Sequence, residues 1–384
     1  MFKPRIEFVT AGIAVAALTI LSACKSGNYS PLPTTAQAPS VRQFDNQSPF
    51  EEPSDVSPDA SILKQLKKQV VIGSAVDPVN GAQNPYGLTV APTTAGAFTK
   101  GDLVICNFNA KSNVQGTGRS IVALHPDPGS KPMHVSAIKE IHGCDALALD
   151  VDDTVWAAVM VANDNPVLDP NGKLQSNISG KPFDQPWGQA LARRGATSYF
   201  YVSNAGTGTI VRIKVGTKFT WQVIATGFPV NHGKPGTALA PSGLSYDDKI
   251  DTLYFADGMN DTIVAFKNVS KVPKNGIKAI HNGMDFNGPA SGDARIVYAG
   301  KPLNGPISTA LLPNGNIIAG NTLDPTGKNL LIEISAGGKL LDVLNVDKGA
   351  AGALFGLAVT GSKLSDIKVY FDDDNDNDVQ MREQ

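Results

Sequence analysis

A hairpin pattern that recurs along the chain is the strongest constraint on its fold. Residues 199–213 read YFYVSNAGTGTIVRI and residues 252–266 read TLYFADGMNDTIVAF. In both, an apolar run ends on Asn or Asp, a short polar turn follows, and Thr-Ile-Val opens a second apolar run. Related segments stand at 103–126, 315–335 and 369–381. Such segments are typical of β-hairpins whose turns use Asn or Asp side chains.

One Asn or Asp ends the first strand of each hairpin. These residues are Asn107, Asn204, Asp257, Asn321 and Asp373. They could form a polar ring, but one copy per repeat at a turn is the pattern of a side chain that caps backbone groups. We therefore predict a structural role for them.

Another short strand, usually opened by Gly, precedes each hairpin. These strands define six units, anchored at residues 87, 146, 188, 243, 307 and 356 and therefore 42 to 64 residues apart. Repeats of this length with three or four strands are the mark of a β-propeller, in which blades around an axis bury each other's faces. Small Gly suits the innermost strands, where the blades converge. The sequence therefore predicts an all-β, six-bladed propeller.

The two ends of this region indicate how the ring closes. The last unit stops at 381–384 after its third strand, whereas residues 67–76, KKQVVIGSAV, form a strand without a unit of its own. We predict that this N-terminal strand completes the last blade, because it would cover an exposed edge. The unit at 144–182 shows no clear fourth strand after VAND, so five or seven blades stay open at this point.

The repeats resemble known propeller sequences. YVSNAGTGTIVRI is similar to the YVTN repeat, and PSGLSYDDKIDTLYFADGMNDTIVAF (241–266) is similar to the NHL repeat. The gluconolactonase-like SMP-30-type propellers are more distant relatives of both. The resemblance covers roughly residues 70–384 and implies a propeller fold. Its motifs are structural, so it implies no particular activity.

The first 24 residues have the order of an export signal. Lys3 and Arg5 precede a mostly apolar stretch from Val9 to Leu21, which is too short to span the ~30 Å core of a bilayer comfortably. The stretch ends in Leu-Ser-Ala-Cys24, which resembles the lipobox of bacterial lipoproteins. The resemblance implies removal of residues 1–23 and lipid attachment to Cys24. Lys25 and Ser26 follow in place of Asp, which favours the outer membrane of the cell envelope.

The expected domains are therefore a signal peptide at 1–23, a lipidated tether at 24–61, and a propeller at 62–384. The tether is rich in Ser, Pro, Thr, Ala and Gln. Which side of the membrane the propeller faces stays open. The chain has 33 Lys+Arg against 35 Asp+Glu, so no basic excess indicates nucleic acid. The expected partners are the membrane, through Cys24, and an envelope protein or a small ligand.

Cys106 and Cys144 are the remaining cysteines. An exported protein can form a disulfide. A Cys106–Cys144 bridge and two buried free thiols both fit the sequence.

Ligands of related folds bind at the mouth of the central channel, so the loops that lead into the innermost strands are the places to search. They contain His142, Asp145 and His232, and Trp187 precedes an innermost-strand Gly. We take these four residues as candidate ligand contacts. Trp156, Trp187 and Trp221 are expected in the blade core, with Trp187 placed so that it could also approach the mouth.

The run Asp-Asp-Asp-Asn-Asp-Asn-Asp at 372–378 is the clearest local indication of a metal site. Asp372, Asp374, Asp376 and Asp378 alternate and offer hard oxygen ligands that suit Ca²⁺. The run lacks the Gly and Glu of an EF-hand loop. A solvated acidic turn is the alternative, so Ca²⁺ is a possible cofactor.

The sequence favours a binding or scaffolding module over an enzyme. It contains no G-x-S-x-G, phosphate-binding loop, dinucleotide fingerprint or C-x-x-C motif. The alternative is a metal-dependent lactonase or hydrolase of the SMP-30 type. That resemblance implies a metal-binding Glu near the chain start with Asn and Asp from later blades. Glu is scarce here: from residue 62 onward it occurs only at Glu140, Glu333 and Glu383, none of which opens an innermost strand.

Overall fold

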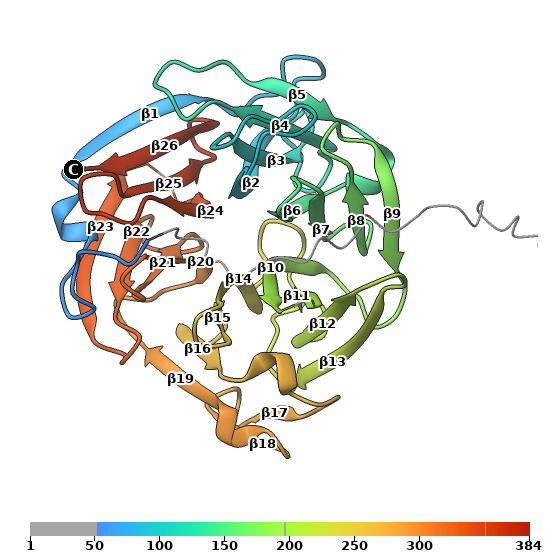
Figure 1. Cartoon of the computed structure of the whole chain (residues 1–384), viewed down its shortest axis with the longest axis vertical. Coiled ribbons are helices and arrows are strands. Elements are labelled where there is room, and N and C mark those ends of the chain that lie inside the picture. Colours follow the sequence, from blue (N-terminus) through green and yellow to red (C-terminus); the bar gives the residue numbers. More distant parts are fainter. Residues whose placement is uncertain (1–51, 196, 350) are drawn as a thin grey trace, which may run out of the picture. The chain divides into compact units, whose positions relative to one another are not determined.

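Six β-sheets surround a central axis in the computed structural model, which describes residues 52–195, 197–349 and 351–384 (Figure 1). Each sheet is one blade, with its first strand innermost. The six-bladed, all-β propeller is confirmed, and the alternatives of five or seven blades are wrong. The unit without a clear fourth strand does have one, because the turn at 169–172 separates two short strands after VAND.

The blades, in chain order, are as follows. Blade 1 contains β2 (Gln83–Val90), β3 (Leu103–Asn109), β4 (Ser120–Leu124) and β5 (Met133–Ser136), and blade 2 contains β6 (Cys144–Leu149), β7 (Val155–Val159), β8 (Asp164–Leu168) and β9 (Leu174–Ser179). Blade 3 contains β10 (Pro186–Arg194), β11 (Thr197–Asn204), β12 (Thr209–Val215) and β13 (Thr220–Thr226), and blade 4 contains β14 (Pro241–Asp247), β15 (Thr252–Asp257), β16 (Thr262–Phe266) and β19 (Ala294–Ala299). Blade 5 contains β20 (Pro306–Leu311), β21 (Ile317–Asn321), β22 (Asn329–Ile334) and β23 (Leu340–Asp347), and blade 6 contains β24 (Ala353–Thr360), β25 (Lys368–Asp373), β26 (Asp378–Glu383) and β1 (Lys68–Ser74).

An insertion between the last two strands of blade 4 is the main departure from regularity. It contains β17 (Ile277–Ile280) and β18 (Asp285–Asn287), and β17 pairs in parallel with β13 of blade 3. Short 3-10 helices are η1 (Leu63–Gln65), η2 (Lys139–Ile141), η3 (Val269–Lys271) and η4 (Ser291–Asp293). Among the described residues, no helix has the length and apolar character needed to cross a bilayer.

Small residues on the innermost strands let the blades meet at the axis. A Cβ atom added to Gly87 would lie 2.8 Å from the Cα of Ala146 in the next blade. A Cβ added to Gly243 would lie 2.7 Å from the Cα of Ser308. Both separations are too short for carbon atoms that are not bonded. The predicted role of Gly at the crowded axis is confirmed, with Ala146 and Ser308 as the small residues of blades 2 and 5.

The ring closes through β1, as predicted. This strand pairs antiparallel with β26, from Lys68 opposite Glu383 to Ser74 opposite Asp378. The side chains of Lys68 and Glu383 form an ion pair at 2.7 Å. Ile72 of β1 is fully buried in the core between blades 6 and 1. The N-terminal strand is therefore an integral part of the last blade.

The Asn and Asp residues at the hairpins hold nearby backbone groups. The side-chain amides of Asn107, Asn204 and Asn321 donate to carbonyl oxygens in the loops that lead into their own blades, at 2.7 to 3.2 Å. Asp257 and Asp373 each accept a backbone N–H of their own turn at 3.1 Å. The predicted structural role is confirmed.

The apolar core lies mainly between neighbouring blades. Trp156 of blade 2 stacks on Phe200 of blade 3 with ring centroids 3.7 Å apart, so its predicted core position is confirmed. The prediction for Trp221 is wrong, because this side chain is 39% exposed. It lies on β13, the fourth strand of the blade, where neighbouring blades have diverged and a ring fits at the surface.

The propeller has two distinct faces. We call the face with the loops that lead into the innermost strands, and with the turns between second and third strands, the mouth face. The opposite face is the base face. Residues 52–66 lie on the base face, just before β1. Glu333 of β22 accepts hydrogen bonds there from the Ser61 hydroxyl at 2.6 Å and from the Leu63 N–H at 2.8 Å. Asp55 accepts the N–H of Leu364 at 2.8 Å.

Candidate functional site

One apolar cluster, which we call the mouth cluster, receives side chains from all around the ring. Its buried members are Tyr86, Phe108, Met160, Trp187, Ala205, Ala238, Ala240 and Ile307, with Val230, Leu239, Leu323 and Phe355 packed against them. These residues come from blades 1, 2, 3, 5 and 6 and from the loop that leads into blade 4. A cluster with contributors from every direction lies on the axis, at the mouth-face end of the innermost strands.

Tyr86 is the centre of the mouth cluster. Its ring stacks on Phe108 with centroids 4.2 Å apart and on Phe355 with centroids 3.6 Å apart. Its hydroxyl donates to Oε1 of Gln115 at 3.1 Å. Tyr86, Trp187 and Phe355 each stand directly before the small residue of their innermost strand. The sequence repeats NPYG, QPWG and ALFG could have revealed this aromatic position, but only if the anchors had been aligned residue by residue.

Buried oxygen atoms without partners surround this aromatic stack. Among the described residues, neither carboxylate oxygen of Asp145 or Asp372 has a hydrogen-bond partner, although these residues are only 2% and 0% exposed. Oδ1 of Asp374 and Oδ1 of Asn84 are also buried and unpaired. A buried polar atom without a partner is destabilising and needs an explanation. All four residues lie in blades 6, 1 and 2.

The carboxyl groups at the mouth titrate abnormally. Burial raises the pKa of Asp145 well above its ordinary range, and the nearby backbone N–H of Met160 opposes this only in part. Burial, followed by the charges of Asp374, Asp373 and Asp378, does the same to the pKa of Asp372. Burial and then Asp373 raise the pKa of Asp374 to about 8. With a pKa of about 8, Asp374 is largely protonated at neutral pH.

The phenol of Tyr86 feels the charges of acids from two blades, blade 6 and blade 2. Burial raises the pKa of Tyr86, and the charges of Asp374 and then Asp145 raise it further. Both carboxyl groups therefore lie within electrostatic range of one hydroxyl. No positive charge is among the groups that shift the pKa of Asp145, Asp372 or Asp374.

A long loop, residues 228–240, folds over the mouth, and we call it the cap loop. In Figure 1 it is the yellow loop near the middle of the ring. Oδ1 of Asn231 accepts the N–H groups of Gly233 and Leu239 at 2.8 and 2.9 Å, which closes the loop on itself. The tip meets blade 1: a Cβ added to Gly116 would lie 3.1 Å from Cβ of Pro235. The cap loop therefore covers the mouth cluster from the solvent side.

The four candidate ligand contacts have different positions. Asp145 and Trp187 are buried at the mouth, in β6 and β10. His142 is half-buried at the end of η2, and His232 is exposed on the cap loop. Sequence reasoning missed Asn84, Gln115 and the aromatic stack, and it did not assign Asp372 and Asp374 to the mouth.

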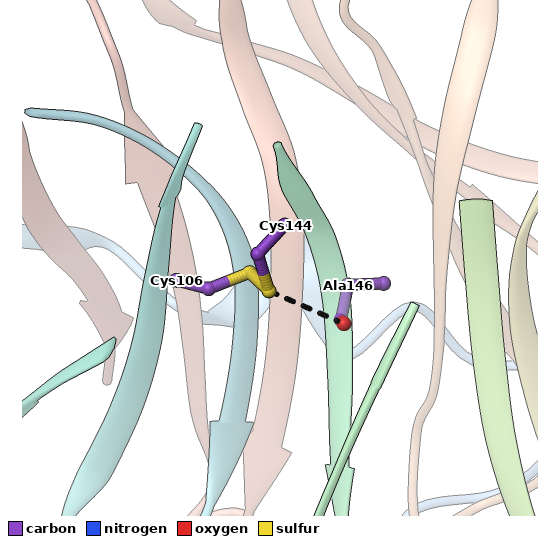
Figure 2. Close-up of a disulfide and its surroundings, with 3 residues drawn as sticks. All are labelled: Cys106, Cys144 and Ala146. Carbon is purple, nitrogen blue, oxygen red and sulfur yellow. Dashed lines mark hydrogen bonds between the residues drawn. A yellow bond between two sulfur atoms is a disulfide. The ribbon is translucent and has the colours of Figure 1, made fainter. Parts of the chain in front are cut away.

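A disulfide between Cys106 and Cys144 lies directly beside the site (Figure 2). It joins β3 of blade 1 to the start of β6 of blade 2, with Cα atoms 5.9 Å apart. The Sγ atom of Cys144 lies 3.8 Å from the carbonyl oxygen of Ala146. Asp145 lies between Cys144 and Ala146 in the sequence, so the disulfide restrains the backbone that carries its unpaired carboxyl group.

The alternating aspartates at 372–378 have different surroundings. Asp372 is buried, whereas Asp376 is exposed. The side-chain amide of Gln380 donates to Asp373 at 3.0 Å and to Asp378 at 3.2 Å. Within the described ranges, no group of three or more His, Cys, Asp or Glu residues is arranged to hold a metal ion. The Ca²⁺ site suggested by the sequence stays a prediction.

Comparison with known proteins identifies the fold alone. No family model matches the chain, and no curated protein does. Among solved structures, regucalcin from Agrobacterium tumefaciens strain C58, described as a calcium-binding protein, has a TM-score of 0.50 at 13% identity, over 82% of this chain and 95% of that one. Virginiamycin B lyase from Staphylococcus aureus has 0.48 at 15%, over 79% and 81%. A streptogramin B lyase has 0.49 at 13%, over 82% and 96%. At 13% identity the similarity to regucalcin is one of fold and establishes no activity.

Proposed function

We propose that this protein is a membrane-anchored binding module whose ligand site is the mouth cluster with Asp145, Asp372 and Asp374. One observation supports this most: unpaired buried oxygens surround a stacked aromatic group on the axis. Apolar walls with a few convergent polar groups are the usual composition of a ligand site. The unpaired oxygens are explained if a ligand satisfies them.

A binding role fits the described residues better than a hydrolase. The nearest approach to a catalytic triad is Asp77 with Ser120 and His134. Both Ser120 and His134, the latter at 2.7 Å, bond to the same oxygen of Asp77. The Ser120 hydroxyl therefore donates its hydrogen bond to the Asp77 carboxylate and not to His134, which a triad would use as the base. A metal-dependent lactonase, the second candidate, would need ligands beyond clustered carboxylates and histidines, such as the amide oxygen of Asn84.

The anchor belongs to the same proposal. Lipid on Cys24 would hold the chain at the membrane of the cell envelope, with the outer membrane favoured. Residues 52–66 join the propeller on its base face. The chain enters the described propeller on this face, so we expect the base face to lie nearer the membrane than the mouth does.

Native mass spectrometry of the full-length protein in detergent tests the binding role. We would incubate it with fractions of envelope extract and look for a stoichiometric small-molecule adduct. Trp187→Ala should lose the adduct, whereas Trp221→Ala, which changes an exposed ring of the same type, should keep it. Equal adducts on both variants, or none on the wild-type protein, would contradict a mouth site. A bound divalent metal together with lactone hydrolysis would favour the second candidate.

A further inference from the structure

We propose that the mouth site takes an organic cation with several N–H donors, such as a polyamine or a guanidino compound. This inference deepens the proposed binding function and rests on it. It starts from the chemistry of the unpaired atoms. The unpaired buried atoms of the three aspartates and Asn84 are all oxygens: two on Asp145, two on Asp372, one on Asp374 and one on Asn84.

Amide oxygens and ionised carboxylates accept hydrogen bonds, so a ligand that donates them fits the ionised form of these acids. The neighbouring Gln115 Oε1 already accepts from Tyr86. No cation of the protein is among the groups that shift the pKa of the three aspartates. Within the part of the chain that the structure describes, the charges that act on these acids are negative, so an anionic ligand would be repelled.

The acids of the site lie on several segments of the chain. A calcium ion needs six to eight oxygens at 2.3–2.6 Å around one point. The carboxyl groups come from three segments, namely β6, β25 and the turn after β25. Acceptors on several segments suit a ligand with several N–H donors. Trp187 and Phe355 add aromatic rings, which attract organic cations more strongly in a dry site than in water.

Binding should be coupled to proton release. Burial raises the pKa of Asp145 well above its ordinary range, so this carboxyl group keeps its proton to higher pH than an exposed aspartate does. A cationic ligand favours the ionised carboxylate and so displaces protons. Deprotonation becomes easier as pH rises, so the apparent affinity should increase from pH 6 to pH 8. A neutral or apolar ligand would show no such increase.

Isothermal titration calorimetry of the full-length protein in detergent can test this. The probes are spermidine and agmatine, with glutarate as an anionic control and CaCl₂ as a separate arm. We expect a spermidine or agmatine affinity that rises at least threefold from pH 6 to pH 8, with proton release seen as a dependence on the ionisation enthalpy of the buffer. Asp145→Asn should weaken the affinity at least tenfold. Asp127→Asn, an exposed aspartate on the base face, should leave it unchanged.

The inference is overturned if neither cation binds, or if Asp127→Asn weakens binding as much as Asp145→Asn. Calcium binding that Asp145→Asn abolishes, without binding of either amine, would also overturn it and assign the site to a metal. If glutarate or an uncharged adduct occupies the mouth in a Trp187-dependent way, the proposed binding function stands and only the ligand class is wrong. If nothing occupies the mouth, both fail.

Discussion

At the scale of single residues, the mouth contains unpaired buried polar groups that destabilise the folded protein. Asp372 occupies a position between blades 6 and 1, where a Cβ added to Gly356 would meet both its carboxyl group and Cβ of Leu88. In blade 1 the matching position is Cys106, which lies beside Gly87 and is in the disulfide. A sulfur there joins two blades, whereas an unpaired carboxyl group only costs free energy. An acid at such a position is better explained by a ligand than by the fold.

The first prediction concerns the free-energy cost of burying the Asp372 carboxyl group without a partner. The pKa of Asp372 is raised in the folded state, so the folded protein holds a proton that the unfolded chain releases above about pH 4. Its contribution to stability is therefore greatest at acidic pH and declines as pH rises toward the folded-state pKa. Asp372→Asn cannot ionise and should be more stable than the wild type at pH 8, by about 1–3 kcal/mol. The difference should shrink toward pH 5.

Urea unfolding at pH 5, 6.5 and 8 measures both effects. Asp127→Asn is the matched control, because that carboxyl group is exposed and on the base face. A variant at Asp372 that is less stable than the wild type at all three pH values would show that the carboxyl group has a partner in the native state.

At the scale of elements, the closure by β1 makes the two ends of the ring interdependent. The strand covers the open edge of β26 over Lys68–Ser74 and contributes Ile72 to the core between blades 6 and 1. The segment before it adds Ile62, Leu63 and Leu66 to the core of blades 5 and 6. An exposed edge and an opened core both promote association between chains.

We therefore predict that deletion of residues 62–76 gives a protein that aggregates or is unfolded. Size-exclusion chromatography and a thermal melt followed by circular dichroism would show this as a void-volume peak without a cooperative transition. Ser74→Ala, an exposed position at the end of the same strand, should melt cooperatively like the wild type. A soluble, cooperatively melting deletion variant would mean that the other strands close the ring without β1.

At the scale of the whole molecule, the sequence repeats predict the architecture but not the candidate site. Gly at the axis, Asn or Asp at each hairpin and an orphan N-terminal strand are local patterns that recur, so each copy supports the others. The site has no repeat. It depends on Asp145, Asp374 and Asn84, which all act on Tyr86 and come from three blades that only the closed ring brings together. The insertion of β17 and β18 was also hidden, because its partner β13 belongs to the preceding blade.

The same architecture leads to a prediction about orientation. Residues 52–66 are held on the base face by Glu333, whose carboxylate is fully buried and also accepts the amide of Asn316 at 2.8 Å. If lipid on Cys24 anchors the chain, the base face lies nearer the bilayer than the cap loop does. In liposomes with fluorescent headgroups, a dye on Lys234→Cys of the cap loop should transfer less energy to the lipid than a dye on Asp127→Cys of the base face. The additional substitution Glu333→Ala should reduce this difference in energy transfer. It removes the hydrogen bonds that hold Ser61 and Leu63, and so the chain that leads to the anchor, on the base face. Stronger transfer from position 234 than from position 127 would place the mouth toward the membrane and make a lipid-borne ligand the one to seek.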